Sequence, residues 1–422
     1  MTANVMNDLK MAEISLAKVP DVNNMVKEAN EVMDDFRVNV AIRDEVQAAL
    51  DTVEQRSDYQ LTIPVVTEVD QVINKHSNIV LKNDTPMVSG TEAFGLSLLP
   101  SEWRILRTGA LKEILAESYK NIKRWANTLS ENFERIWTEL NTSIEVLETR
   151  LEATVATLDV VTTKVDGINE VEINELVARS ISKNGKLPGG DIAAVLKGEV
   201  NYILLCLRAW SSEQIKYKGD IIRYFGNERN VELDEVVRVL PKVFDQRAEV
   251  DPKYRTMLTA RATRPMIGDK VFEGVALDPK WVRDNIKSVA DNTTYADALS
   301  FTGYHVEDYK ASAKAGKATM SIMTMSQMYA LCDLVENILA ELRKMNSESD
   351  PTNFNPDDVK DVLGTLKATN TSDQRAYQYG LMTADYQYNV NNFKTQSTTM
   401  LTVLASHLIT LINAHLANYN VN

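Results

Sequence analysis

The clearest candidates for chemistry are basic side chains gathered in one stretch of an acidic chain. Residues 242–287 hold 10 lysines and arginines against 7 acidic residues, whereas the whole chain has a formal net charge of −13. Clusters of lysine and arginine neutralise phosphates, so they are the usual footprint of nucleic-acid contact. A solvated or salt-bridged face is the alternative interpretation. The predicted phosphate contacts are Lys253, Arg255, Arg261, Arg264 and Lys270.

The other reactive residue types do not form a catalytic or metal-binding motif. Gly185 and Lys186 precede a Gly-Gly pair, but the order GxxxxGK[ST] is missing, so a turn is favoured over a phosphate loop. The histidines show neither HExxH nor ligand spacing with cysteine, and we expect them at the surface or at an interface. No pair of acidic residues lies in a motif that would tune its pKa for acid and base catalysis. We therefore predict no catalytic residue, no metal and no cofactor, and a protein that is not an enzyme.

The longest helical pattern runs through residues 110–166, which contain neither glycine nor proline. An unbroken helix there would be roughly 85 Å long. Its apolar positions recur with spacings of 4, 4 and 3, an eleven-residue repeat with about 3.67 residues per turn that keeps an apolar stripe nearly straight. A rod or a long helical hairpin is the expected product. The stripe consists of Trp125, Leu129, Phe133, Ile136, Leu140, Ile144, Leu147 and Leu151, and continues to Leu158.

Helical patterns also cover most of the second half of the chain. They run through residues 192–225, 231–247, 321–344, 357–367 and 384–418. Asn184–Gly185 suits a tight turn, and Asp191 suits a helix cap. Prolines and glycines punctuate short apolar runs between residues 262 and 310, which is typical of short strands. The predicted fold class is mainly α, with long amphipathic helices and a small α+β insert near 262–310.

The N-terminal part is set apart by its charge and by a break in pattern. Residues 1–92 contain 16 acidic and 8 basic side chains, a net charge of −8 that leaves −5 for the rest. Prolines at positions 20 and 64 predict two or three short helices there. Residues 81–100 carry prolines and glycines without a helical stripe, and predict a linker. We expect an acidic helical leader at 1–92, a long-helix region at 93–183 and a helical body at 184–422.

Targeting signals and disulfides are not indicated by the sequence. The N-terminus has neither the basic region nor the apolar core of a secretory signal, and no apolar run reaches about 18 residues. The two cysteines, Cys206 and Cys332, lie in apolar stretches and are expected to be buried thiols. We therefore expect synthesis in a reducing cytoplasm and no membrane partner.

The order of these features resembles the internal head proteins of large tailed bacteriophages. The resemblance spans most of residues 85–340. The sequence segments on which it rests are GTEAFGLSLLP, ALKEILAESYKNIKRWANTLSENFERIWTELNTSIEVLETRLEA, ISKNGKLPGGDIAAVL and RPMIGDKVFEGVAL. The resemblance implies a non-enzymatic structural protein, made in the host cytoplasm and packed with the scaffold core inside the head. Its partners would be other virion or capsid proteins, with weak nucleic-acid contact and homo-oligomers as further expectations.

The same resemblance implies trimming by a phage maturation protease. Such proteases recognise a small residue two positions before a cleaved glutamate, and Gly90, Thr91 and Glu92 match within the predicted linker. Cleavage after Glu92 would make residues 1–92 a propeptide. Four other tripeptides match equally: Ala29–Asn30–Glu31, Ser143–Ile144–Glu145, Ser211–Ser212–Glu213 and Gly226–Asn227–Glu228.

Two other functions fit a mainly helical chain of this length. An RNA-virus nucleoprotein would need a basic groove, for which the candidates are Arg255, Arg261, Arg264 and Lys270. A helical scaffold or adaptor protein would instead use the apolar stripe as its partner face, although burial against the protein's own helices explains that stripe as well.

Overall fold

The computed structural model describes residues 22–56, 60–79, 100–225, 235–285, 298–299, 301–309, 318–347, 350, 352 and 374–421. The predicted processing tripeptide at 90–92 and the predicted helix at 357–367 lie outside these residues. The chain divides into a larger unit, comprising Met1–Val26, Phe133–Asn355 and Leu381–Asn422, and a smaller unit, comprising Lys27–Asn132 and Pro356–Gly380. The division falls within helix α4 (Pro100–Leu158), so it differs from the predicted boundaries at 92 and 183.

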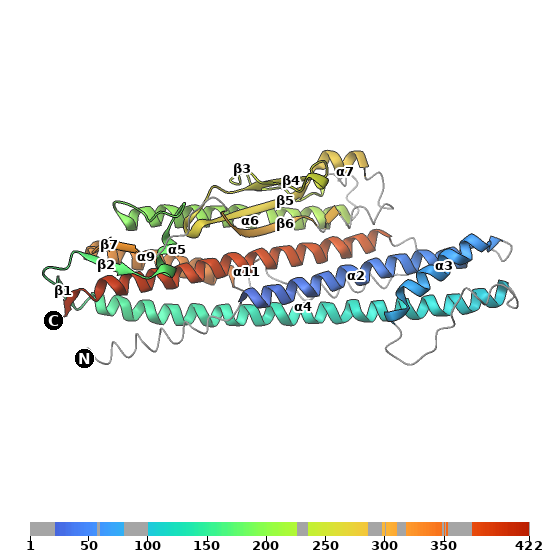
Figure 1. The fold of residues 1–422 in the computed structure, drawn as a ribbon, viewed down its shortest axis with the longest axis horizontal. Helices are drawn as coiled ribbons and strands as arrows, with labels where there is room; N and C mark the ends of the chain where they lie inside the picture. Colours follow the sequence, from blue (N-terminus) through green and yellow to red (C-terminus); the bar gives the residue numbers. More distant parts are fainter. Residues whose placement is uncertain are drawn as a thin grey trace. The chain divides into compact units, whose positions relative to one another are not determined.

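The smaller unit is built from helices α2 (Val22–Gln55), α3 (Ile63–His76) and the first part of α4 (Figure 1). A short 3-10 turn, η2 (Ser77–Ile79), follows α3. Val46 and Val53 of α2 and Val69 of α3 share one buried core with Trp103 and Leu111 of α4. Phe36 stacks on Trp125 with ring centroids 3.9 Å apart. Most of the described part of the predicted leader is therefore packed against residues that follow position 92.

The N-terminal helices are longer than the prolines suggested. The prediction of short helices is wrong for α2, which has 34 residues, whereas α3 has 14. Pro64 lies in the first turn of α3, where the helix has no backbone partner for an N–H and proline is tolerated. A proline at that position marks where a helix begins.

Helix α4 confirms the long-helix prediction and shows what its apolar face does. All eight stripe residues from Trp125 to Leu151 are buried, and none is more than 9% exposed. In the larger unit, Arg150 of α4 donates to Ser406 Oγ of helix α11 (Gln374–Leu416) at 3.2 Å. Arg343 of α9 (Met325–Met345) pairs with Glu148 at 2.6 Å. Burial of one face accounts for the stripe, and a rod or hairpin built on an eleven-residue repeat stays a prediction.

The predicted insert of short strands is present and begins earlier than expected. An antiparallel sheet has the order β3-β4-β5-β6, from β3 (Gln246–Arg247), β4 (Leu258–Ala262), β5 (Lys270–Leu277) and β6 (Gly303–Asp308). Two short 3-10 turns, η5 (Pro252–Tyr254) and η6 (Ile267–Asp269), precede β4 and β5, and helix α7 (Pro279–Asn285) follows β5. The predicted helix at 231–247 is wrong for its described part, 235–247, where Pro241 lacks the N–H that a helix interior needs.

Aromatic side chains attach this sheet to two long helices of the larger unit. Figure 1 shows α6 (Ile192–Phe225) running alongside the sheet. Phe393 of α11 lies at the centre of the attachment, 4.8 Å from the ring of Trp210 in α6 and 5.1 Å from that of Phe272 in β5. Tyr304 of β6 joins them at 5.7 Å from Phe393. Position 274 requires glycine, because a Cβ there would come within 2.8 Å of the Tyr304 ring.

Two small ladders bring distant parts of the chain together. Strand β1 (Val161–Lys164), directly after α4, pairs with the C-terminal β8 (Tyr419–Val421), and β2 (Glu170–Ile173) pairs with β7 (Ala318–Ser321). Helix α5 (Glu175–Ile181) follows β2 in the chain. Asn184 and Gly185 both have positive φ, which confirms the tight turn. The side chain of Asp191 accepts from the N–H groups of Ala193 and Ala194, which confirms the predicted cap.

Helix α11 buries many polar groups along with its apolar ones. By length and composition the stretch Tyr379–Leu416 could cross a membrane, but 61% of its apolar 18-residue window is buried inside the protein. Lys394 is fully buried, with Nζ 3.4 Å from Asp350 and 5.1 Å from the ring centroid of Trp137. Burial lowers the pKa of Lys394 to about 8. Such internal ion pairs are features of a core helix.

The expectation that the histidines lie at the surface or at an interface is wrong for two of them. His415 of α11 is fully buried, and His76 of α3 is 8% exposed. The N–H of Met323 donates to Nδ1 of His415 at 3.2 Å. A neutral imidazole can be buried when one ring nitrogen accepts a hydrogen bond in this way. Both cysteines are buried free thiols, as predicted.

Candidate nucleic-acid interface

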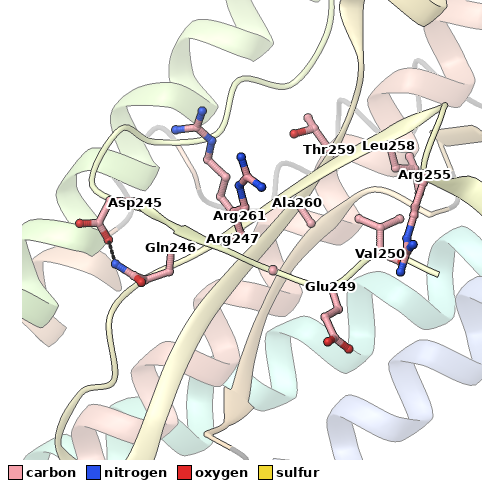
Figure 2. A pocket seen from close by; sticks show the side chains of 11 residues that line it. Asp245, Gln246, Arg247, Glu249, Val250, Arg255, Leu258, Thr259, Ala260 and Arg261 are labelled. Carbon is pink, nitrogen blue, oxygen red and sulfur yellow. Dashed lines mark hydrogen bonds between the residues drawn. The ribbon is translucent and has the colours of Figure 1, made fainter. Parts of the chain in front are cut away.

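The basic stretch forms an open groove of about 710 Å³ on the edge strand of the sheet. Its wall is made by the end of β3, the loop that follows it, and β4 (Figure 2). Strand β3 is only two residues long and pairs with β4 alone, so it forms one edge of this sheet. The charged residues that line the groove are Arg247, Arg255, Arg261, Asp245 and Glu249.

Two arginines lie directly opposite each other across the first two strands. In the antiparallel register Arg247 of β3 faces Arg261 of β4, and Figure 2 shows their guanidinium groups side by side. Both side chains are exposed, and neither forms an ion pair with a carboxylate of the described residues. Like charges in directly opposed positions destabilise a β-ladder. The pair is therefore an unfavourable arrangement unless an anion lies between or beside the two groups.

Arg255 lies at another part of the same groove. Its Nε donates to the carbonyl oxygen of Val250 at 3.3 Å, which leaves the rest of the guanidinium free to bind. The neighbouring ring of Tyr254 packs against Phe301 in a tilted arrangement, with centroids 4.3 Å apart, and Lys253 Nζ lies 5.1 Å from the centroid of the Tyr254 ring. Exposed cations and an aromatic pair thus adjoin the arginine groove.

The groove is not uniformly positive. Asp245 and Glu249 also line it, and Asp245 accepts a hydrogen bond from the amide of its neighbour Gln246 at 2.9 Å. Three arginines against two carboxylates leave a net charge of +1 on the lining. An anion held here would be bound weakly and in competition with salt.

The structure brings together only part of the predicted phosphate-binding set. Arg255 and Arg261 line the groove, and Lys253 adjoins it. Arg264 instead pairs with Glu199 at 3.1 Å, and its guanidinium lies 4.0 Å from the ring centroid of Tyr202. Lys270 pairs with Asp308 at 2.5 Å across β5 and β6. Both side chains act in the packing of the sheet and are poorly placed to take up phosphate.

Arg247 was missed among the named candidates, although it lies within the basic stretch. Its neighbours in the sequence are Gln246 and Ala248, so local composition does not distinguish it from a solvated arginine. Its place in the site depends on pairing with Arg261, fourteen residues away. A sequence pattern that predicted the register of β3 against β4 could have identified Arg247 as a site residue.

A second cavity, of about 490 Å³, lies beside α11 and next to the sheet, and it carries no catalytic arrangement. His305 and His407 both line it, and burial lowers the pKa of each, so both are neutral near pH 7. Gln396 in its wall accepts from the N–H of Val306 at 2.8 Å and is a structural contact. Within the part of the chain that the structure describes, no group of three or more His, Cys, Asp or Glu side chains could hold a metal ion.

Removing one of the opposed arginines should stabilise the fold. We expect Arg261→Thr to raise the free energy of unfolding by a few tenths of a kcal/mol to about 1 kcal/mol, because threonine suits a strand and the repulsion disappears. Urea unfolding at low ionic strength, followed by circular dichroism, measures the change. Arg255→Thr is the matched control, since Arg255 lies outside the strands and faces no cross-strand arginine. Equal effects of the two variants would contradict the repulsion.

Comparison with known proteins gives one match. The family model of the phiKZ-like phage internal head proteins matches residues 21–420 of this chain. No curated protein and no solved structure matches it.

Proposed function

The chain belongs to the phiKZ-like phage internal head proteins, and from this premise we propose that it is a non-enzymatic structural protein held inside the head by contacts between helices. The observation that carries the proposal is the extent of the family match. It begins at residue 21 and ends at residue 420, so it includes the N-terminal helices, the long helices and the sheet. Membership supports a phage structural role, a place in the virion interior, and association with other virion components.

The helices offer surface for such contacts. Leu205, Ile215 and Ile222 of α6 are exposed, and helical spacing places them on one side of the helix. Exposed apolar side chains that share a face are typical of protein contact sites. We propose that contacts of this kind hold the protein among its neighbours after synthesis in the host cytoplasm. The RNA-virus nucleoprotein and the free-standing adaptor have no comparable support from the family match.

We also propose that a maturation protease cuts after Glu92. Three of the four competing tripeptides end at Glu31, Glu145 and Glu213, which lie inside helices α2, α4 and α6. Proteases cut preferentially at exposed loops and linkers, so helical glutamates are poor substrates. The tripeptide Gly90–Thr91–Glu92 lies between α3 and α4 in the sequence, outside both helices.

Cleavage there should nick the protein without releasing the leader. The two sides of position 92 share the core of the smaller unit, including the stack of Phe36 on Trp125. Arg107 of α4 also binds Asp70 of α3 at 2.6 Å, with both side chains largely buried. Dissociation would expose the apolar side chains of this shared core to water, which costs free energy in proportion to the apolar area exposed. Residues up to 92 should therefore stay attached through noncovalent contacts.

The test is the mass of the protein recovered from purified virions. We expect denaturing mass spectrometry to find a chain beginning at Ala93 together with the 1–92 fragment, and native gel filtration to elute the two together. Full-length protein in virions would overturn the cleavage proposal. A chain beginning at Ala93 without the fragment would overturn the retention of the leader.

A matched pair of variants assigns the cut. Glu92→Gln should give full-length protein in virions, whereas Glu31→Gln, which alters an equivalent tripeptide inside α2, should leave processing unchanged. Processing that persists in Glu92→Gln would place the site elsewhere.

A further inference from the structure

We propose that the groove between β3 and β4 binds the phosphodiester backbone of duplex nucleic acid through Arg247, Arg261 and Arg255. Such a site would give the protein a binding activity beyond the structural role proposed above. The site does not depend on cleavage at Glu92, because every residue involved lies in the larger unit.

Arg247 and Arg261 occupy facing positions in the ladder, and their charges repel in the absence of a ligand. A phosphate oxygen placed beside both guanidinium groups converts that repulsion into two charge-assisted interactions. Arginine is suited to this because its planar fork offers several N–H donors in a fixed geometry. The arrangement is thus unfavourable empty and favourable when an anion is bound.

The arginines that line the groove are available to bind an anion. Arg264 and Lys270, in the same basic stretch, are occupied by Glu199 and Asp308. Arg247 and Arg261 form no such ion pair with the described residues. Arg255 uses only one of its N–H donors, in the hydrogen bond to the Val250 carbonyl oxygen. All three are exposed around one hollow of the surface. The division between paired and available basic side chains marks the groove as the place for an anionic partner.

The short edge strand β3 favours a nucleic-acid backbone over an acidic peptide as the partner. A peptide that docks on a sheet edge gains affinity from main-chain hydrogen bonds along the edge strand. Strand β3 has only two residues, which is too short to template another strand. Recognition must therefore come from side-chain charge, which suits a backbone with regularly spaced phosphates. The rest of this acidic chain repels nucleic acid, so binding should be confined to the groove.

The test is binding of a fluorescently labelled mixed-sequence DNA duplex to the full chain, measured by anisotropy over a salt series. Three phosphate contacts predict that log K falls with log salt with a slope of about −2.7 for duplex DNA. The double variant Arg247→Gln/Arg261→Gln should weaken binding by at least about tenfold at low salt and reduce the slope by about 2. Circular dichroism and thermal melting should show that this variant is folded.

The matched control removes the same number of charges at paired positions. Arg264→Gln/Lys270→Gln should bind duplex DNA within about threefold of the unmodified protein, since these side chains are already neutralised. A loss as large as that of the groove variant would show that only net charge matters and would overturn the site. No binding at low salt would also overturn it. Binding of polyglutamate through the groove, with none of DNA, would replace the nucleic acid with an acidic protein partner.

Discussion

Replacing Phe393 with alanine should lower the free energy of unfolding by about 3–5 kcal/mol, the usual range for removing a fully buried phenylalanine. Phe393 is completely buried in α11 and contacts the rings of Trp210, Phe272 and Tyr304. Its loss removes apolar area, leaves a cavity, and breaks three ring contacts that join α6, α11 and the sheet. Urea unfolding followed by circular dichroism measures the effect.

The same substitution should also loosen strands β3 and β4, which form the groove, since they are held in place through β5 and β6. Phe301→Ala provides the control, because that ring is 42% exposed and should cost less than about 1 kcal/mol. A loss below about 1 kcal/mol for Phe393→Ala would mean that the aromatic cluster does not hold the sheet on the helices.

Lowering the pH from 7 towards 4.5 should destabilise the larger unit by up to about 3 kcal/mol through His415, at about 1.4 kcal/mol per pKa unit. Burial lowers the pKa of His415 to about 4, from an ordinary value of 6.5. Between these values the unfolded chain binds a proton that the folded protein does not, so stability falls as the pH falls. Above pH 6.5 the contribution is fully present. Burial also lowers the pKa values of His305 and His407, which act in the same direction.

Urea midpoints at several pH values between 7.5 and 4.5 measure this loss, and His415→Gln tests its origin. The glutamine carbonyl can still accept from the Met323 N–H, but it does not titrate. The variant should therefore lose less stability on acidification than the unmodified protein. Glu148 does not confuse the result, because the Arg343 hydrogen bond lowers its pKa and its contribution is lost only at lower pH. An unchanged pH profile in His415→Gln would contradict the assignment.

The locally determined features are those that the sequence predicted well. Helix α6 has the predicted bounds, and the turn at Asn184 and the cap at Asp191 are present. These features depend on residues three or four positions apart, or on backbone conformations that particular residue types allow. The family resemblance, stated from the layout of the chain, agrees with the match over residues 21–420.

Two local signals resemble boundaries that the tertiary structure does not have. Pro64 suggests a break, but proline at the start of a helix is compatible with a long helix before it and another after it. The drop in periodicity after residue 81 suggested a separate leader, but α2 and α3 share their core with Trp103 and Leu111. Which apolar faces meet is decided by packing between distant segments.

The sequence by itself determined that the protein is mainly helical, where the long helices α4 and α6 run, and that positive charge gathers between residues 242 and 287. Only the tertiary structure decided which of those charges are available. Glu199, 65 residues before Arg264, neutralises it, whereas Arg247 and Arg261 are brought face to face by strand register. Periodicity reports contacts within one element, but charge pairing and burial, as at His415, depend on contacts between elements that no local pattern encodes.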